Sequence, residues 1–178
     1  MLVYHAAMTA AEDYLERRAP HRQAHFERIT GLRAQGFVIG GGPAPDGRTA
    51  DIFYRVAQAS DVTGLIEDDP YFLGKVWAAY TLRTFSQFIE PWELPPVVMD
   101  GSRRATIVEG VALESDMATF ALIELRGAGR LAFGGFFEDG TTLALMKTAD
   151  SAEASGWLVE TGFWKNETLT ARPFLYAL

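Results

Sequence analysis

Two glycine-rich segments of the chain repeat one another at a fixed distance. Each carries a glycine pair and then an Asp-Gly dipeptide, a combination that favours a tight turn between two strands. The turn dipeptides are Asp46-Gly47 and Asp139-Gly140 (139 − 46 = 93), and the glycine pairs Gly41-Gly42 and Gly134-Gly135 keep the same offset. Self-similarity at one offset indicates that a structural unit occurs twice. We therefore predict a domain followed by a repeat of it.

Residues 1–92 have the apolar pattern of a mixed α+β domain. Strands are predicted where apolar residues alternate, and helices where they recur every three or four positions. The predicted strands are residues 2–8, 37–43, 51–57 and 80–90. A capping-box pair, Thr9 and Glu12, predicts a helix start, and Pro20 permits a fresh start for a long helix over residues 20–35. A second, short helix is capped by Ser60 or Asp61 and ends at the EDDP stretch. The order β-α-β-β-α-β is the split arrangement of ferredoxin-like folds.

The rest of the chain is predicted to be a linker and a degenerate repeat. Residues 93–116 form the linker or crossover because they begin with the proline-rich PWELPPVVMDG, and within them residues 102–115 fit either a strand or an extended segment. Residues 117–178 form the repeat. Its first predicted strand, 118–125, leads almost directly to a second at 130–137, so the repeat lacks the first long helix. A strand at 141–148, a helix at 151–161 and a strand from residue 168 complete the order β-β-β-α-β.

The composition excludes several classes of function. The formal net charge of −7 argues against a nucleic-acid partner, which needs clustered Lys and Arg. The absence of cysteine excludes disulfides, thiolate metal sites and a cysteine nucleophile. The N-terminal MLVYHAAMTAAEDYL lacks a basic start and an apolar stretch, and no apolar run reaches membrane-spanning length. We therefore expect a cytoplasmic protein with no membrane partner.

The segment RQAHFERITGLRAQGFVIGGGP, together with the later EDDPYF, resembles the YciI-like (YCII-related) family. Its members carry an R-x-x-H-L-like helix, a G-x-L-L-x-x-G-P strand and a D-P-Y stretch after the second helix. The resemblance covers most of residues 1–92, and the second half looks like a degenerate copy. It implies a ferredoxin-like α+β fold of the dimeric α/β barrel superfamily, with the two halves packed sheet to sheet within one molecule as a pseudodimer.

The resemblance also implies a site. Family members use a histidine and an aspartate in the barrel pocket, and the matching positions here are His25 and Asp69 as a catalytic acid/base pair. Tyr71, Arg22 and His21 are the accompanying candidates for substrate binding. One branch of the family is a dehydrochlorinase of chlorinated hydroxyquinols. The implied function is a lyase, isomerase or dehydrochlorinase-like enzyme that needs no cofactor and acts on an aromatic or carbonyl compound; a homodimer is left open.

The same residues have structural interpretations. A histidine on the apolar face of a helix is often a hydrogen-bonded core residue, and Asp69 before Pro70 is a good N-cap for a short helical turn. One carboxylate can fill both roles. The alternative function is a non-catalytic ligand-binding or assembly module in which the His-Asp pair is structural. An enzyme needs an open cavity that reaches His25, and this cavity is expected in the first half, because Asp69 corresponds to Gly162 in the second (69 + 93 = 162).

Two further interpretations concern metals and anions. His21 and His25 have the i, i+4 spacing of metal ligands, but no glutamate accompanies them as in H-E-x-x-H, so no metal site is predicted. A haem or metal-dependent barrel is suggested by analogy of fold alone. Arg17, Arg18 and Arg22 form a basic run that is suited either to a carboxylate or phenolate or to a solvated helix face.

Overall fold

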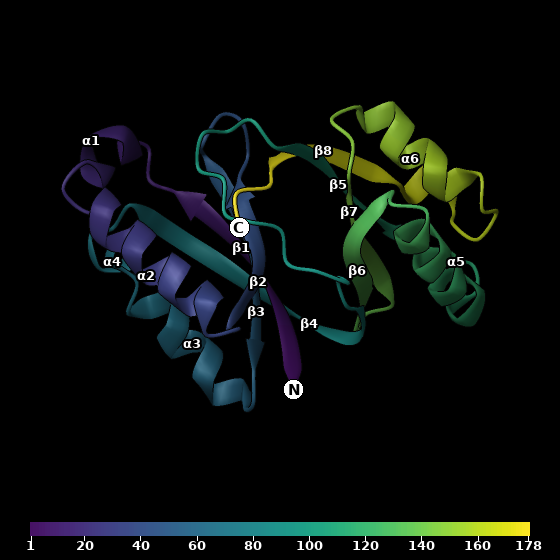
Figure 1. Ribbon diagram of the computed structural model, residues 1–178, viewed down its shortest axis with the longest axis horizontal. Coiled ribbons are helices and arrows are strands. Elements are labelled where there is room, and N and C mark those ends of the chain that lie inside the picture. Colours follow the sequence, from purple (N-terminus) through teal and green to yellow (C-terminus); the bar gives the residue numbers. More distant parts are fainter. The chain divides into compact units, whose positions relative to one another are not determined.

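The computed structural model describes residues 1–178, which divide into two compact units (Figure 1). The N-terminal unit comprises residues 1–84, 95–101 and 176–178. The C-terminal unit comprises residues 85–94 and 102–175. The long strand β4 (Trp77–Ile89) contributes residues to both units. None of the helices is long and apolar enough to cross a membrane.

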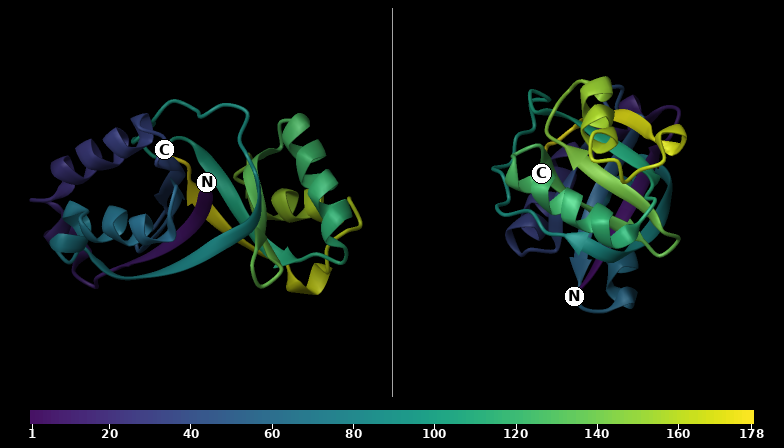
Figure 2. Two further views of the ribbon diagram at one scale, coloured as in Figure 1. Left: turned by 90° about the horizontal axis from the view of Figure 1, so that it is seen from below. Right: turned by 90° about the vertical axis from the view of Figure 1, so that its right-hand side faces the viewer.

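The N-terminal unit has an antiparallel sheet in the order β2-β3-β1-β4. Two helices, α2 and α3, lie on one face of this sheet (Figures 1 and 2). The predicted order β-α-β-β-α-β is confirmed, and two short helices, α1 and α4, accompany the two longer ones. The elements before β4 are β1 (Leu2–Ala10), α1 (Tyr14–Arg18), α2 (Arg22–Ala34), β2 (Val38–Pro43), β3 (Thr49–Val56), α3 (Ala59–Glu67) and α4 (Pro70–Leu73).

Local sequence signals explain where these helices begin and end. Helix α2 ends before Gly36, which has a φ of +81°, a conformation that glycine adopts without strain. Helix α3 begins with a reciprocal capping box between Gln58 and Asp61, so Asp61 takes part in the cap but Gln58, and not Ser60, is the N-cap residue. Helix α4 begins at Pro70, as predicted, with Asp69 as its cap.

The core of the N-terminal unit lies between the helices and one face of the sheet. Alternate residues of β1 point into it, because successive side chains of a strand face opposite sides. Helices α2 and α3 supply aliphatic side chains at helical spacing, and α2 also turns His25 toward the sheet. The buried residues of these elements in the cluster are Tyr4, Ala6, Met8, Ile29, Leu32, Val62 and Ile66.

The C-terminal unit repeats this order of elements. Its sheet runs β4-β6-β7-β5-β8, with α5 and α6 packed on one face. The elements after β4 are β5 (Arg104–Val111), α5 (Ser115–Gly127), β6 (Leu131–Phe137), β7 (Thr141–Met146), α6 (Ser151–Val159), the 3₁₀ helix η1 (Asn166–Thr168) and β8 (Thr170–Leu175).

The prediction that this half lacks the first long helix is wrong. Residues 118–125, predicted as a strand, lie within the 13-residue helix α5. The buried residues Ala118, Ala121, Leu122 and Leu125 recur every three to four positions, which is the helical period and not the strand period. Gly129, with a φ of +75°, follows the end of the helix. The first strand of this half is β5, which lies within residues 102–115, the segment whose sequence fits either a strand or an extended crossover.

The offset of 93 residues extends to element boundaries that the sequence comparison did not reach. Helix α2 starts at 22 and α5 at 115 (115 − 22 = 93), and they end at 34 and 127 (127 − 34 = 93). Strands β4 and β8 start at 77 and 170 (170 − 77 = 93). The two units therefore place equivalent elements at equivalent sequence positions, while their origin by duplication stays a prediction.

The close approach of β4 and β6 gives a prediction for stability. A Cβ at Gly135 would lie 2.1 Å from the backbone oxygen of Gln87, so Gly135→Ala is expected to lower the free energy of unfolding by about 1–3 kcal/mol. Gly156, inside α6, has open space around it, and Gly156→Ala is expected to raise that free energy by about 0.5–1 kcal/mol. Urea unfolding of both variants measures these changes. If Gly135→Ala did not lower the free energy of unfolding relative to Gly156→Ala, the close approach of β6 to the backbone of Gln87 would be wrong.

Candidate active site

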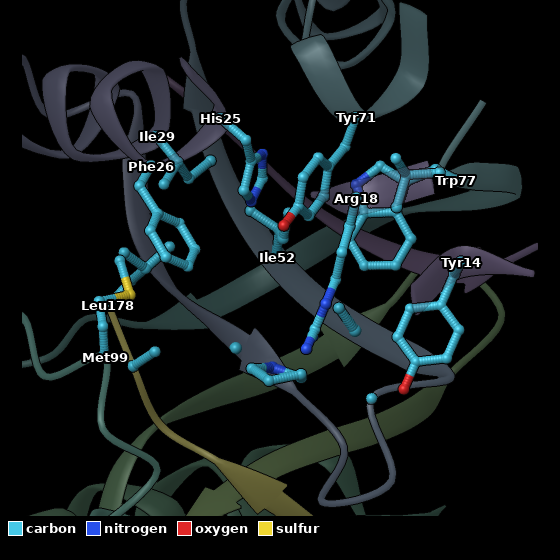
Figure 3. Close-up of a pocket in the computed structure, with 16 residues that line it drawn as sticks. Tyr14, Arg18, His25, Phe26, Ile29, Ile52, Tyr71, Trp77, Met99 and Leu178 are labelled. Carbon is cyan, nitrogen blue, oxygen red and sulfur yellow. The ribbon is translucent and has the colours of Figure 1, made fainter. Parts of the chain in front are cut away.

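A pocket of about 150 Å³ opens in the N-terminal unit, and all of its lining residues belong to that unit (Figure 3). The lining is mostly aliphatic and aromatic. A cavity of this volume is large enough for one six-membered ring. The side chains labelled in Figure 3 are Tyr14, Arg18, His25, Phe26, Ile29, Ile52, Tyr71, Trp77, Met99 and Leu178.

His25 and Asp69 form a buried hydrogen bond at this pocket. The Nδ1 atom of His25 lies 2.8 Å from Oδ1 of Asp69, and the two side chains are only 10% and 6% exposed. A carboxylate only accepts hydrogen bonds, so Nδ1 carries the donated proton. In the neutral ring this leaves Nε2 with its lone pair, and Nε2 makes no hydrogen bond within the protein. The arrangement provides a general base that is held in one tautomer.

The same carboxylate oxygen caps helix α4. Oδ1 of Asp69 accepts a hydrogen bond from the backbone N–H of Tyr71 at 2.8 Å, and Pro70 occupies the first helical position. One oxygen therefore fills both roles that the sequence left open. The other two acids of the stretch are exposed: Glu67 accepts a hydrogen bond from the Tyr80 hydroxyl at 2.9 Å, and Asp68 follows the last residue of α3.

Tyr71 lies flat against the imidazole of His25. Their ring centroids are 3.9 Å apart and the planes differ by 6°, while Trp77 meets Tyr71 edge-on at 5.7 Å. Burial raises the pKa of the Tyr71 hydroxyl, and the positive charges of Arg18 and Arg22 oppose this rise only in part. The hydroxyl therefore stays protonated at neutral pH and is available as a hydrogen-bond donor at the pocket.

The other two predicted substrate-binding residues do not line the pocket. His21 precedes α2, and its ring packs against Gly74, where a Cβ would meet the ring at 2.3 Å. The guanidinium of Arg22 lies over the ring of Phe26, 5.2 Å from its centroid. Of the basic run it is Arg18 that reaches the pocket. The sequence marked the run but could not distinguish its members, because tertiary packing decides which of them reaches the pocket.

Residues from the linker and the C-terminal segment also line the pocket. Met99 and Leu178 lie near Phe26 in Figure 3. Backbone hydrogen bonds hold these segments: the N–H of Val98 donates to the oxygen of Ala177 at 2.8 Å, and the N–H of Leu178 donates to the oxygen of Gly41 at 2.9 Å. No local sequence signal indicates such contacts, since they join residues far apart in the chain.

A second histidine-aspartate contact escaped the sequence analysis. Nε2 of His5, on β1, lies 2.6 Å from Oδ1 of Asp51 on β3, and His5 stacks on Phe53 at 5.1 Å. His5 alternates with the core residues of β1, so it lies on the sheet face opposite the helices and outside the pocket lining. The sequence predicts that His5 lies on the first strand, but its contact with Asp51 depends on the register between β1 and β3, which the sequence does not show.

The C-terminal unit has different residues at the equivalent positions. The counterpart of His25 is Ala118 (25 + 93 = 118), and that of Asp69 is Gly162 (69 + 93 = 162). Trp164 takes the place of Tyr71 (71 + 93 = 164); it is buried, and its indole N–H donates to the hydroxyl of Thr142 at 2.9 Å. This unit therefore has no equivalent of the His-Asp pair.

The residues at the pocket do not fit a metal ion or a haem group. No group of three or more His, Asp or Glu side chains is arranged to hold a metal. The cavity of about 150 Å³ accommodates one ring, whereas haem is a macrocycle of four pyrroles. The Nδ1 atom of His25 is already engaged by Asp69, and His21 packs elsewhere.

Comparisons with known proteins show the fold. No family model and no curated protein matches the chain. A "putative monooxygenase" from Lactobacillus acidophilus NCFM is 10% identical with a TM-score of 0.61, covering 99% of this chain and 94% of that one. A mutant chlorite dismutase from Candidatus Nitrospira defluvii is 14% identical with a TM-score of 0.52, covering 99% and 91%.

A third solved structure matches only part of the chain. The 5-chloro-2-hydroxyhydroquinone dehydrochlorinase from Burkholderia phenoliruptrix AC1100, in complex with 2,5-dihydroxybenzoquinone, is 18% identical and covers 45% of this chain and 89% of that one. Its TM-score is 0.41. The two likenesses that cover nearly the whole chain show the fold alone, in which each unit has the element order of ferredoxin-like folds. Membership of the dimeric α/β barrel superfamily stays a prediction, and so does membership of the YciI-like family.

The double role of Asp69 predicts how its variants will behave. Asp69→Ala removes the cap of α4 and the acceptor for Nδ1 of His25, so the free energy of unfolding should fall by about 2–4 kcal/mol. Asp69→Asn keeps an oxygen acceptor and should cost less than about 1 kcal/mol. Asp68→Ala, at the exposed neighbour, is the control and should change stability by less than about 0.5 kcal/mol. Urea unfolding measures these changes. If Asp69→Ala lowered the free energy of unfolding no more than Asp68→Ala does, the double role of Asp69 would be wrong.

Proposed function

We propose that the chain is a small-molecule enzyme of the lyase or isomerase kind, in which His25 transfers a proton to or from a single-ring phenol or carbonyl compound. The observation that supports this most strongly is the orientation of His25. Asp69 holds the proton on Nδ1, and the remaining nitrogen, Nε2, belongs to a side chain that lines a pocket of ring size. A general base needs such a free lone pair within reach of its substrate.

In the proposed reaction Nε2 of His25 removes a proton from a hydroxyl group or from a carbon next to a carbonyl. The ring then carries a positive charge, which the carboxylate of Asp69 stabilises through Nδ1. The electron pair of the broken bond passes to a substrate oxygen, and the hydroxyl of Tyr71 can donate a hydrogen bond to it.

Two outcomes complete the reaction. In an isomerase, His25 returns the proton to a different atom of the substrate. In a dehydrochlorinase-like lyase, the electron pair forms a new double bond as the carbon-chlorine bond breaks, chloride leaves, and the proton on Nε2 passes to water. Both outcomes are balanced without an oxidant, a reductant or a cofactor.

The shape of the pocket supports a flat, largely apolar substrate. Phe26 and Trp77 are among its walls, with Ile29 and Ile52 from the core side. Apolar walls with a few polar groups are typical of sites for small molecules. They also exclude water, which strengthens the electrostatic interactions of the His25-Asp69 pair.

The alternative is a ligand-binding or assembly module in which the pair is structural. The cap that Asp69 provides for α4 favours this alternative, because it explains the carboxylate without a substrate. An assembly module would need no pocket at His25, whereas the catalytic proposal and a ligand-binding module both explain one.

We further propose that the N-terminal unit is a YciI-like domain and that the C-terminal unit is its duplicated, degenerate copy. The shared offset of 93 residues at α2 and α5 supports the duplication. Each chain then has one catalytic site, because Ala118 and Gly162 stand in the C-terminal unit where the N-terminal unit has His25 and Asp69. We also propose that the protein acts in the cytoplasm and that its two units form a pseudodimer. Association of two such chains as a homodimer is compatible with this proposal.

Proton exchange tests the catalytic proposal. Monocyclic phenols, chlorinated quinols and cyclic ketones are incubated with the protein in D₂O, and deuterium incorporation and chloride release are followed by NMR and ion chromatography. At least one compound should react faster with the protein than without it, and His25→Gln should slow that reaction by about 100-fold or more. His21→Gln, a histidine outside the pocket, should leave the rate unchanged.

A binding result without chemistry would favour the alternative. If compounds bind near His25 but none exchanges protons or releases chloride, or if His25→Gln reacts as fast as the wild type, the catalytic role of His25 is wrong.

A further inference from the structure

Arg18 is the only permanently charged side chain among the residues that line the pocket. No aspartate, glutamate or lysine accompanies it there. Figure 3 shows its side chain extending between Tyr71 and Tyr14, with the guanidinium end directed into the space that the drawn residues surround. The pocket therefore combines apolar walls with a single fixed positive charge.

This charge has no counter-ion within the protein. Arg18 makes no hydrogen bond or ion pair, and its guanidinium carbon lies 5.7 Å from the centroid of the Tyr14 ring. The neighbouring Arg17 differs: its Nε atom lies 2.5 Å from Oδ1 of Asp13, on the exposed side of α1. A guanidinium next to apolar walls and without a partner favours an incoming anion, which it can bind through two parallel N–H groups.

The ring of Tyr14, which Arg18 contacts, is held in place by the turn between β2 and β3. The hydroxyl of Tyr14 donates a hydrogen bond to the backbone oxygen of Asp46 at 2.8 Å. Gly47 allows this approach, because a Cβ there would lie 2.7 Å from that hydroxyl, and its φ of +71° also favours glycine. A cation–π contact with a fixed aromatic ring restricts the guanidinium and reduces the entropy lost when it binds a ligand.

The charge of Arg18 also acts on the interior of the pocket. It lowers the pKa of the Tyr71 hydroxyl against the larger, opposite effect of burial. Arg18 and Tyr71 thus belong to one electrostatic environment, with His25 stacked on the far side of the Tyr71 ring.

We propose that Arg18 determines the substrate class: the pocket takes a single-ring organic anion, whose carboxylate or phenolate binds the Arg18 guanidinium while the ring lies among the aromatic walls. This inference rests on the proposed function in one respect: that the bound anion is a substrate whose proton is transferred at Nε2 of His25. The binding of the anion itself depends on Arg18 and the pocket alone.

Benzoate and benzamide test this assignment because they share a shape and differ in charge. Their dissociation constants are measured by NMR titration of the wild type, Arg18→Gln and Arg17→Gln. The wild type should bind benzoate about tenfold or more tightly than benzamide, the size expected for a charge-assisted hydrogen bond. Arg18→Gln should abolish this preference. Arg17→Gln removes the same formal charge from the same helix outside the pocket, so the preference should remain.

Three results would overturn the assignment: equal binding of the two probes by the wild type, a preference that survives in Arg18→Gln, or no binding of benzoate. His25→Gln separates this inference from the proposed catalysis. If that variant keeps the preference for benzoate while no compound reacts in the exchange experiment, Arg18 is an anion site and the catalytic proposal fails. If compounds react through His25 while Arg18→Gln binds benzoate as the wild type does, the catalytic proposal stands and the Arg18 assignment fails.

Discussion

The arrangement of the candidate site depends on one carboxylate oxygen. Oδ1 of Asp69 accepts hydrogen bonds from the backbone of α4 and from the imidazole of His25 on α2. The first contact fixes where α4 begins and thereby places Tyr71, and the second fixes the tautomer of His25. The parallel stacking of Tyr71 on His25 follows from these two constraints, because both rings are attached to groups that the same oxygen holds. The structural and catalytic interpretations of Asp69 are therefore not exclusive.

The two units have the same order of helices and strands but different buried side chains. Their helices and strands occupy positions 93 residues apart, yet the buried imidazole of one unit is matched by Ala118 in the other. Trp164, with its indole bonded to Thr142, is buried where the first unit has Tyr71 at a pocket. Such substitutions are compatible with the fold because core packing needs apolar volume, whereas a site needs specific polar groups around an open space.

The sequence predicted the features that depend on local chemistry. Turn glycines, the cap at Asp69 and the helical face of His25 were all visible in short segments. Helix α5 was predicted as a strand because short, dense apolar runs fit both patterns; its helical period shows in the positions that are buried, which the sequence alone does not distinguish from the other apolar positions. The pocket positions of Arg18 and Leu178 depend on long-range contacts, which no local pattern encodes.

The orientation of His25 by Asp69 is tested most directly by a long-range ¹H–¹⁵N spectrum of the histidine side chains, recorded at a pH where the imidazoles are neutral. We predict that His25 carries its proton on Nδ1, and that its Nε2 resonance shifts when a monocyclic phenol or carboxylate is added. A proton on Nε2, or an Nε2 resonance that no ligand of this kind moves, would contradict a base that Asp69 orients toward the pocket.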